Sequence, residues 1–273
     1  MYISNDFYFN GQKLSDYGFI ICDFGDNDGM KNASAGSAIE YNTSKPPRSH
    51  EWMDIGGEYS EPLEFEIAIC KNPDALDEGK YNNGYLTIAE ERKISKWLKQ
   101  NQGFQEFYFV PIEIGQETIF FFARITGFES VRICSSIVGY KLTITTNAPF
   151  GFSEEKVTEI IGSSSTSVQK IIDIDSDERD HIFPKITVFT DTPGDVYIDN
   201  VSNGSNTYLY NLTANETVII DKTHIGIKTD TNHNIIANFN KRWLRLSDGS
   251  NTIKVKGKCN VTISYREPRK VGS

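Results

Sequence analysis

The 273-residue sequence has little of what marks several classes of protein. Its four cysteines are far apart and form no Cys-x-x-Cys pair, so zinc-ligand spacing and redox motifs are both absent. We expect all of them to be reduced, buried thiols: Cys22, Cys70, Cys134 and Cys259. With 21 Gly and 9 Pro, the chain also has too little of either residue for a collagen-like or low-complexity protein.

Long hydrophobic runs are missing as well. No stretch of about 18 apolar residues occurs, and the first residues contain neither the basic nor the apolar region of a secretion signal. We therefore expect neither a secreted precursor nor membrane insertion. Basic residues are outnumbered, because 28 Lys and Arg stand against 37 Asp and Glu. The resulting net charge of −9 argues against general binding to nucleic acid.

Aromatic residues, in contrast, are abundant. The 17 Phe, 13 Tyr and 3 Trp supply more buriable surface than a disordered chain carries. The length fits two domains or one large all-β domain. Residues 1–152 hold 13 basic and 21 acidic side chains, whereas residues 153–273 hold 15 and 16. This uneven charge favours two domains with a boundary between residues 152 and 153.

The last part of the chain is basic. From Lys241 onward there are nine basic residues and two acidic ones. A solvated surface is the simpler interpretation. The alternative is that the acidic and basic ends of neighbouring copies meet.

Residues 1–152 show strand patterns and one helix. Asn10-Gly11 predicts a type I′ hairpin turn after an aromatic strand. Thr87 and Glu90 form a capping box that predicts the start of a helix, with Gly103 as its stop. Further strands are predicted at residues 19–22, 62–70, 104–110, 118–125 and 137–145. Residues 25–47 are polar and predict a long loop, which we expect to be functional or to reach a partner.

Residues 153–273 show short strands and turns only. Strands are predicted at residues 185–190, 196–200, 208–212, 217–221, 225–228, 235–239, 243–246, 252–255 and 261–265. Asn203-Gly204 and Asp248-Gly249 predict hairpin turns, and the serine-rich run 162–167 predicts a loop or linker. The pattern is typical of a β-sandwich of jelly-roll type.

No motif carries catalytic chemistry. Glu64 and Glu66 lie on one strand face, roughly 7 Å apart, a spacing found among glycosidase carboxylate pairs, but we interpret them as the exposed face of that strand. The sequence has no Gly-x-Ser-x-Gly elbow and no phosphate-binding glycine loop. We therefore expect no catalytic and no cofactor-binding residues, and no enzyme activity.

Metal ligands are not predicted either. Asp173-x-Asp175-x-Asp177 begins like a calcium loop, but Glu178 stands where an EF-hand needs Gly and Pro184 where it needs Glu. The four histidines form no metal-binding pair, and each is interpreted as a loop or strand residue: His50, His181, His224 and His233.

Three consecutive phenylalanines stand out among the aromatic residues. Alternation assigns most of the aromatic side chains to core faces, but Phe120, Phe121 and Phe122 cannot all face one core. At least one of them must leave that face. This predicts burial between two sheets or between subunits.

Several motifs recur in the order and spacing of a known family. They are Phe7-Tyr8-Phe9-Asn10-Gly11 with Ser15-Asp16-Tyr17-Gly18-Phe19-Ile20, Lys96-Trp97-Leu98 in the helix, Ala148-Pro149-Phe150-Gly151, Trp243-Leu244-Arg245-Leu246-x-x-Gly249-x-Asn251-Thr252-Ile253, and Val261-Thr262-Ile263-Ser264-Tyr265-Arg266. Together they resemble the distal tail proteins of siphophages that infect Gram-positive bacteria. The resemblance spans nearly the whole chain.

The resemblance implies a mainly β fold. A ring-forming belt domain with one helix would occupy residues 1–152, and a galectin-like β-sandwich residues 153–273. Six copies would form a hub ring at the virion tail tip, without enzyme activity. The ring would join the major tail tube protein to a tail-associated lysin, fibre or receptor-binding protein. The subunits would be made in the cytoplasm of the bacterial host.

Two other functions are weighed against this one. The first is a carbohydrate-binding module that recognises cell-surface glycans through exposed Tyr or Trp side chains of the sandwich. The stretches 233–236 and 243–246, however, lack the polar groups with which galectins bind sugar. The second is a glycoside hydrolase that uses Glu64 and Glu66.

Overall fold

The computed structural model describes residues 4–24, 37–73, 84–100, 103–223 and 226–270. The chain divides into two compact units. Unit 1 comprises Met1–Phe152 with Lys270–Ser273, and unit 2 comprises Ser153–Arg269. Among the described residues, no helix has the length and apolar character that crossing a membrane requires. The prediction of a mainly β fold with one helix is confirmed.

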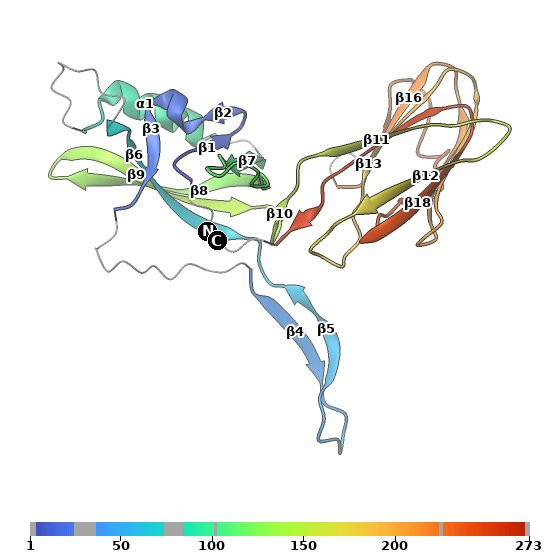
Figure 1. The fold of residues 1–273 in the computed structure, drawn as a ribbon, viewed down its shortest axis with the longest axis horizontal. Coiled ribbons are helices and arrows are strands. Elements are labelled where there is room, and N and C mark those ends of the chain that lie inside the picture. The colour runs from blue at the N-terminus through green and yellow to red at the C-terminus, as the bar shows by residue number, and fades with distance from the viewer. Residues whose placement is uncertain (1–3, 25–36, 74–83, 101–102, 224–225, 271–273) are drawn as a thin grey trace. The chain divides into compact units, whose positions relative to one another are not determined.

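Unit 1 is built on one antiparallel sheet in the order β2-β1-β7-β8-β9-β6-β3, with β10 paired to β8 (Figure 1). Its strands are β1 (Phe7–Phe9), β2 (Gln12–Lys13), β3 (Phe19–Cys22), β6 (Glu64–Lys71), β7 (Gln105–Phe109), β8 (Phe120–Ile133), β9 (Ser136–Thr146) and β10 (Gly151–Phe152), and a 3-10 turn covers Leu14–Tyr17. The predicted hairpin turn between β1 and β2 is confirmed, with positive φ at both Asn10 and Gly11.

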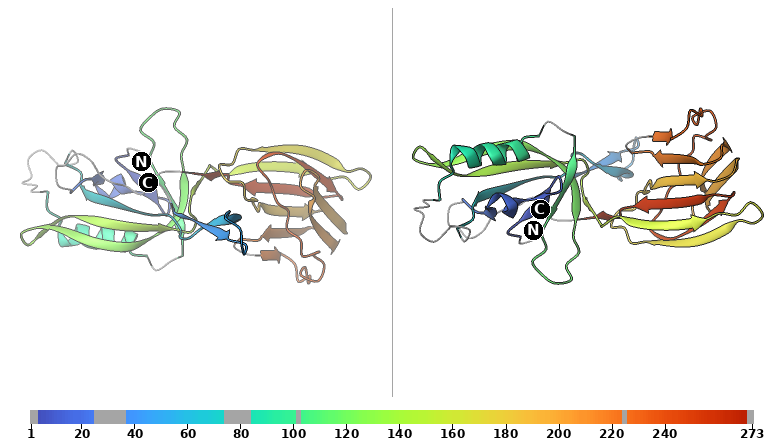
Figure 2. Two further views of the ribbon diagram at one scale, coloured as in Figure 1. Left: turned by 90° about the horizontal axis from the view of Figure 1, so that it is seen from below. Right: turned by 90° about the horizontal axis from the view of Figure 1, so that it is seen from above.

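Helix α1 (Ile88–Leu98) lies along this sheet (Figures 1 and 2). It begins at the predicted capping box, in which the Glu90 backbone N–H donates to Thr87 and the Thr87 backbone N–H donates to the Glu90 carboxylate. The helix buries Trp97, whose ring stacks on Tyr17 with 4.4 Å between centroids. The Trp97 Nε1–H donates to the Phe9 carbonyl at 3.1 Å, so the indole is satisfied inside the core.

Two strands of unit 1 were not expected from the sequence. β4 (Ile39–Ser44) and β5 (Met53–Tyr59) pair antiparallel and form a sheet of two strands. The predicted loop at residues 25–47 is therefore wrong for residues 39–44, while residues 25–36 lie outside the described part of the chain.

Unit 2 is a sandwich of two antiparallel sheets over one apolar core (Figure 2). The first sheet has the order β11-β19-β13-β16-β17, and the second has the order β12-β18-β14-β15. The strands are β11 (Lys156–Ile161), β12 (Val168–Ile174), β13 (Lys185–Thr190), β14 (Gly194–Asn200), β15 (Ser205–Leu212), β16 (Glu216–Asp221), β17 (Gly226–Thr229), β18 (Gly249–Lys256) and β19 (Asn260–Tyr265). The short β20 (Pro268–Arg269) belongs to neither of these two sheets.

Several expectations for unit 2 are corrected. Residues 235–239 form turns with an isolated bridge at Phe239, and residues 243–246 form no strand, although Leu246 bridges to Ile182. Strands β11 and β12 were missed, and the serine-rich run 162–167 connects them inside unit 2. Asp248-Gly249 leads into β18 and does not join a hairpin, whereas Asn203-Gly204 turns between β14 and β15 as predicted.

The expectation of four buried thiols is wrong in part. Only Cys259 is fully buried; Cys134 is exposed, and Cys22 and Cys70 are half-buried. Burial raises the pKa of the Cys259 thiol to about 11. Cys134 stands in the turn between β8 and β9, where its φ is 55°, and its side chain is exposed.

Candidate assembly surface

The structure does not assemble the carboxylates named from the sequence into a reactive site. Glu64 and Glu66 are exposed on β6, and Glu64 accepts a hydrogen bond from the Thr145 hydroxyl at 2.8 Å. This is the exposed strand face that the sequence predicted. Asp173 accepts from the Ser250 hydroxyl, and Asp175 pairs with Arg269 at 3.5 Å.

Histidines and other potential ligands are equally dispersed. Within the described ranges, no group of three or more His, Cys, Asp or Glu side chains is arranged to hold a metal ion. His181 contacts the Ser247 hydroxyl, and His233 Nδ1 lies 3.0 Å from the Glu216 carboxylate. His224 lies outside the described residues.

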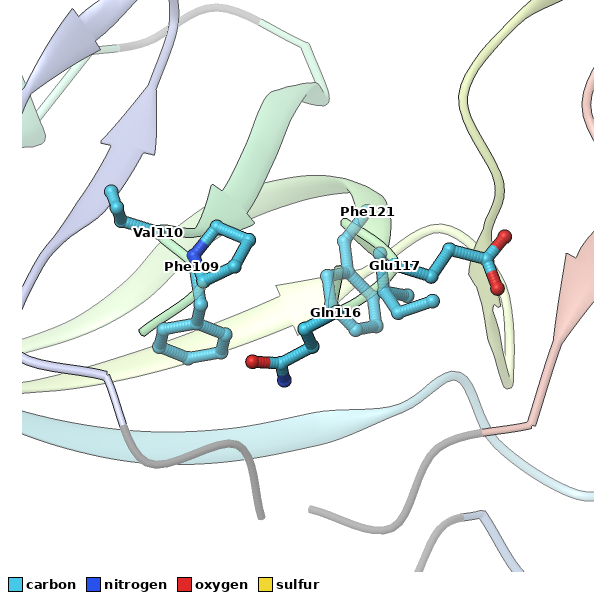
Figure 3. A pocket seen from close by; sticks show the side chains of 7 residues that line it. Phe109, Val110, Gln116, Glu117 and Phe121 are labelled. Atoms are coloured by element: carbon cyan, nitrogen blue, oxygen red, sulfur yellow. The ribbon is translucent and has the colours of Figure 1, made fainter. Parts of the chain in front are cut away.

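A hollow in unit 1 is too small for a ligand. It lies between Phe109, Gln116 and Phe121 and has a volume of about 10 Å³ (Figure 3). A buried water molecule needs roughly 10 to 15 Å³, so this space holds one water at most.

The strongest surface feature of unit 1 is the hairpin of β4 and β5. Apart from Tyr59, every residue of the two strands is exposed. Five large apolar side chains of the hairpin are between 42% and 69% exposed: Ile39, Tyr41, Trp52, Met53 and Ile55. A two-stranded hairpin without a core is marginally stable in water, and exposed apolar patches mark interaction surfaces.

Two apolar side chains of the hairpin, Ile39 and Tyr41, lie on the same face. Ile39 and Tyr41 lie over Gly57, because a Cβ added at Gly57 would stand 2.9 Å from Ile39 Cγ2 and 3.2 Å from Tyr41 Cδ1. At the tip, the Lys45 ammonium lies 5.8 Å from the centre of the Trp52 ring. Ile39 and Tyr41 thus share one face, while Met53 is paired with Ser44 nearer the tip. The exposed residue types of the hairpin, Tyr, Trp and Met, are enriched in protein interfaces.

A second aromatic surface crosses the main sheet of unit 1. The register places Tyr8 opposite Tyr108, Tyr108 opposite Phe120, and Phe120 opposite Phe152. The rings of the first two pairs contact each other with centroids 4.7 and 4.9 Å apart. All four side chains are half-buried, whereas Phe121 on the opposite face of β8 is buried. The prediction that the three consecutive phenylalanines divide between two faces is thus confirmed.

Sequence reasoning missed the hairpin, although one signal was available. Trp52, Met53 and Ile55 stand within nine residues of Glu58 and Glu61, a mixture of large apolar and acidic side chains without the alternation of a half-buried strand. In a loop, so many apolar side chains have no core to enter. Their density was therefore the available indication of an interaction surface.

Comparison with known proteins identifies the family of the chain. Residues 2–148 match the family described as phage tail protein N-terminal domain, and residues 150–265 match the phage tail C-terminal domain. No curated protein matches the chain.

Two solved structures are similar in fold. The Dit (gp 19.1) protein of phage SPP1, described as a paradigm of hub adsorption apparatus in phages that infect Gram-positive bacteria, has 12% identity and a TM-score of 0.63, over 97% of this chain and 98% of that one. A chain of the phage P2 baseplate in its activated conformation has 8% identity and a TM-score of 0.53, over 96% and 98% of the two chains. Because the two family models together cover almost all of the sequence, this chain belongs to the phage tail protein family.

Proposed function

We propose that this chain is a structural subunit of the hub at the tip of a phage tail, in which six copies close into a ring. The proposal is supported by the two family models and by the similarity of the whole chain to the Dit protein of phage SPP1. It involves no catalysis, and the structural role needs none.

Within this proposal the two units have different partners. Unit 1 forms the ring and joins it to the major tail tube protein, while unit 2 faces a tail-associated lysin, fibre or receptor-binding protein. The subunit is made in the cytoplasm of the bacterial host and acts in the virion tail tip.

The observation that carries the proposal is the apolar hairpin of β4 and β5. A closed ring requires two different patches that meet head to tail, so that each copy contributes one patch to each neighbour. The hairpin offers a first patch, because its apolar side chains have no core of their own. The half-buried aromatic row of Tyr8, Tyr108, Phe120 and Phe152 offers a second one on the same unit.

Removal of the hairpin tests this assignment. Glu40 and Glu58 are register partners, so residues 41–57 can be replaced by Asn-Gly, which closes a two-residue turn at that position. Native mass spectrometry and electron microscopy of the purified chain, with and without its tail tube partner, count the copies per particle. We expect rings of six for the natural sequence and folded monomers for the shortened one.

A double substitution separates the loss of a contact between copies from a loss of folding. Trp52→Ser with Ile55→Ser removes two exposed apolar side chains and leaves the backbone of the hairpin in place. Ile171→Ser is the matched control, since Ile171 is an equally exposed apolar residue on β12 of unit 2. Rings that survive both the deletion and the double substitution would refute the role of the hairpin. A natural chain that stays monomeric even with the tube partner would refute the hub itself.

A further inference from the structure

A cluster of tyrosines lies on the outer face of the second sheet of unit 2. Tyr197 on β14 is the register partner of Tyr208 on β15, and Tyr210 follows two residues along β15. The ring of Tyr197 meets those of Tyr208 and Tyr210 edge to face, with centroids 5.1 and 6.1 Å apart. All three alternate with buried residues of the core and are themselves half-buried.

Carboxylates hold two of these rings in place. The Tyr197 hydroxyl donates to Asp195 Oδ2 at 3.0 Å, and the Tyr208 hydroxyl donates to Asp199 Oδ1 at 2.7 Å. The hydrogen bond to Asp199 raises the pKa of Tyr208 to about 12, so this hydroxyl keeps its proton at any physiological pH. The cluster is therefore pre-organised, which lowers the entropy that a ligand would otherwise lose on binding.

A groove opens directly beside Tyr197. It has a volume of about 280 Å³, and Thr190, Asp195, Tyr197, Lys256 and Lys258 are among its lining residues. Typical small-molecule sites have roughly 300 to 1,000 Å³, so this groove fits a ligand of one or two rings. Gly257 lets the backbone at this position approach β14, since a Cβ there would stand 2.5 Å from the Asp195 carbonyl oxygen.

The lining carries both hydrogen-bond donors and acceptors around one aromatic ring. The Asp195 carboxylate already accepts from the Tyr197 hydroxyl and the Asn211 backbone N–H, but a carboxylate offers about four acceptor positions. Lys256 is exposed and stands opposite Tyr197 in the register. Sugar rings present an apolar C–H face together with hydroxyls that donate and accept, and this combination suits an aromatic ring flanked by a carboxylate and an ammonium group.

The charges of the groove favour a neutral ligand. Lys258 pairs with the Asp191 carboxylate at 3.4 Å, and Lys256 faces a groove that also holds the Asp195 carboxylate. Two ammonium groups are thus matched by two carboxylates, which leaves no excess positive charge for an anion.

We propose that this groove binds a neutral saccharide, with a sugar ring packed against Tyr197 and its hydroxyls bonded to Asp195 and Lys256. The site differs from the two stretches compared with galectins in the sequence, because His233 is engaged by Glu216 and Leu244 and Leu246 are buried in the core. Saccharide binding here goes beyond the proposed hub role and does not depend on ring formation.

The test is a titration of the full-length chain with methyl α-glucoside, methyl β-galactoside, methyl β-N-acetylglucosaminide and inorganic phosphate. Saturation-transfer NMR detects contact, and calorimetry gives the affinity. We expect at least one glycoside to bind with a dissociation constant in the millimolar range. Tyr197→Ala and Asp195→Ala should each weaken that binding at least about tenfold.

Matched variants keep the result interpretable. Phe189→Ala removes an aromatic side chain that is 42% exposed on β13 of the other sheet, and it should leave binding unchanged. A Cβ at Gly194 meets no atom within 4 Å, so Gly194→Phe starts from an unobstructed position, introduces bulk at the groove and should abolish binding. Circular dichroism verifies that each variant is folded.

Three results would overturn the proposal. They are the absence of binding by every glycoside, equal binding by the folded Tyr197→Ala variant, and binding of phosphate alone. The particle size of the Tyr197→Ala variant separates this inference from the hub, because loss of sugar binding with intact rings leaves the assembly proposal standing.

Discussion

Glu216 offers the sharpest quantitative prediction, because the fold of unit 2 buries this carboxylate completely. One oxygen accepts from the Thr213 backbone N–H at 2.7 Å and from the Thr213 hydroxyl at 2.9 Å. The other accepts from the Thr229 hydroxyl at 2.7 Å and the Thr231 hydroxyl at 3.2 Å, and lies 3.0 Å from His233 Nδ1. The turn after β15 and the segment after β17 are therefore both attached to one side chain.

The pKa of Glu216 measures this stabilisation. Burial alone would raise the pKa, but the hydrogen bonds from the Thr213 backbone, Thr229 and His233 outweigh it and lower the pKa from 4.5 to about 2. Since one pKa unit corresponds to about 1.4 kcal/mol, the ionised carboxylate contributes on the order of 3 kcal/mol to the folding of unit 2.

Glu216→Gln removes that contribution. The amide replaces one of the two carboxylate oxygens by an NH₂ group, which cannot accept a hydrogen bond. Whichever oxygen is replaced, its donors lose their acceptor: either Thr213, or Thr229 and Thr231. A buried unsatisfied donor alone costs about 1 to 3 kcal/mol, in agreement with the value from the pKa. In a domain of this size the loss of about 3 kcal/mol lowers the unfolding temperature by on the order of 10 °C at pH 7.

The difference in stability between the natural chain and the Glu216→Gln variant must depend on pH. The folded-state pKa is depressed, so the stabilisation is fully present above pH 4.5 and is lost as the pH falls toward 2. Differential scanning calorimetry of the full chain at a series of pH values measures it. Glu159→Gln, at an exposed position of β11, is the control and should behave as the natural chain does. A Glu216→Gln variant that is equally stable at pH 7, or one whose deficit stays constant down to pH 2, would refute the reasoning.

Two further predictions concern unit 1 and the thiols. Thr87→Ala breaks the capping box of α1 and should destabilise unit 1 by about 1 kcal/mol, measured by calorimetry as a lower unfolding temperature. Thr87→Ser keeps a capping hydroxyl and should retain most of the stability. In an alkylation assay at pH 8, the exposed Cys134 should react first and Cys259, whose pKa burial raises to about 11, should react last. The fast phase of alkylation should be lost in Cys134→Ser, and rapid alkylation of Cys259 would contradict the predicted order of reaction.

Local chemistry was sufficient to predict the elements whose signals are short-range. Asn10-Gly11 adopts the positive φ angles of its turn, and Thr87 with Glu90 begins the helix. β13 occupies the predicted residues, because the buried Ile186 and Val188 alternate with exposed or half-buried neighbours over a single core. In each case the information lies within a few consecutive residues.

The segment 243–246 shows why a strand pattern alone can mislead. Leu244 and Leu246 are buried, as in a strand, but the backbone bonds mainly to side chains. The Leu244 N–H donates to the Thr207 hydroxyl at 2.9 Å, and the Arg245 N–H donates to the Ser205 hydroxyl at 3.0 Å. Alternating burial reports which residues face the core, but it does not report which groups satisfy the backbone.

Residues 235–239 fail for another reason. Ile235 and Phe239 are buried four residues apart, while Ile236 between them is 61% exposed. Burial at that spacing is the pattern of a turn at the edge of the core. From the sequence alone, a short apolar run does not tell such a turn from a strand. Which of these apolar side chains enters the core is decided by β15, where Leu209 bridges to Phe239.

The tyrosine cluster and its groove could not be read from the sequence because they depend on pairing between separate strands. Tyr197 and Tyr208 come together only through the register of β14 and β15, and the groove beside Tyr197 needs the approach of Gly257, which directly follows β18. The hairpin was obscured because Asp54 and the glycines at 56 and 57 are unusual in strands. With both faces of the hairpin exposed, no alternation marks it.

The hairpin also combines apolar side chains with a charge pattern that disfavours it in isolation. Glu40 and Glu58 are direct cross-strand partners on an exposed ribbon, and like charges in that position are destabilising. An isolated subunit therefore carries a hairpin that lacks a core and contains a repulsive pair. Both costs fall when the hairpin contacts a second surface that covers Tyr41 and Trp52 and brings basic groups near the carboxylates. In the ring that we propose, this arrangement suits each subunit, because the same two acidic residues oppose edge-to-edge pairing of hairpins before the ring closes.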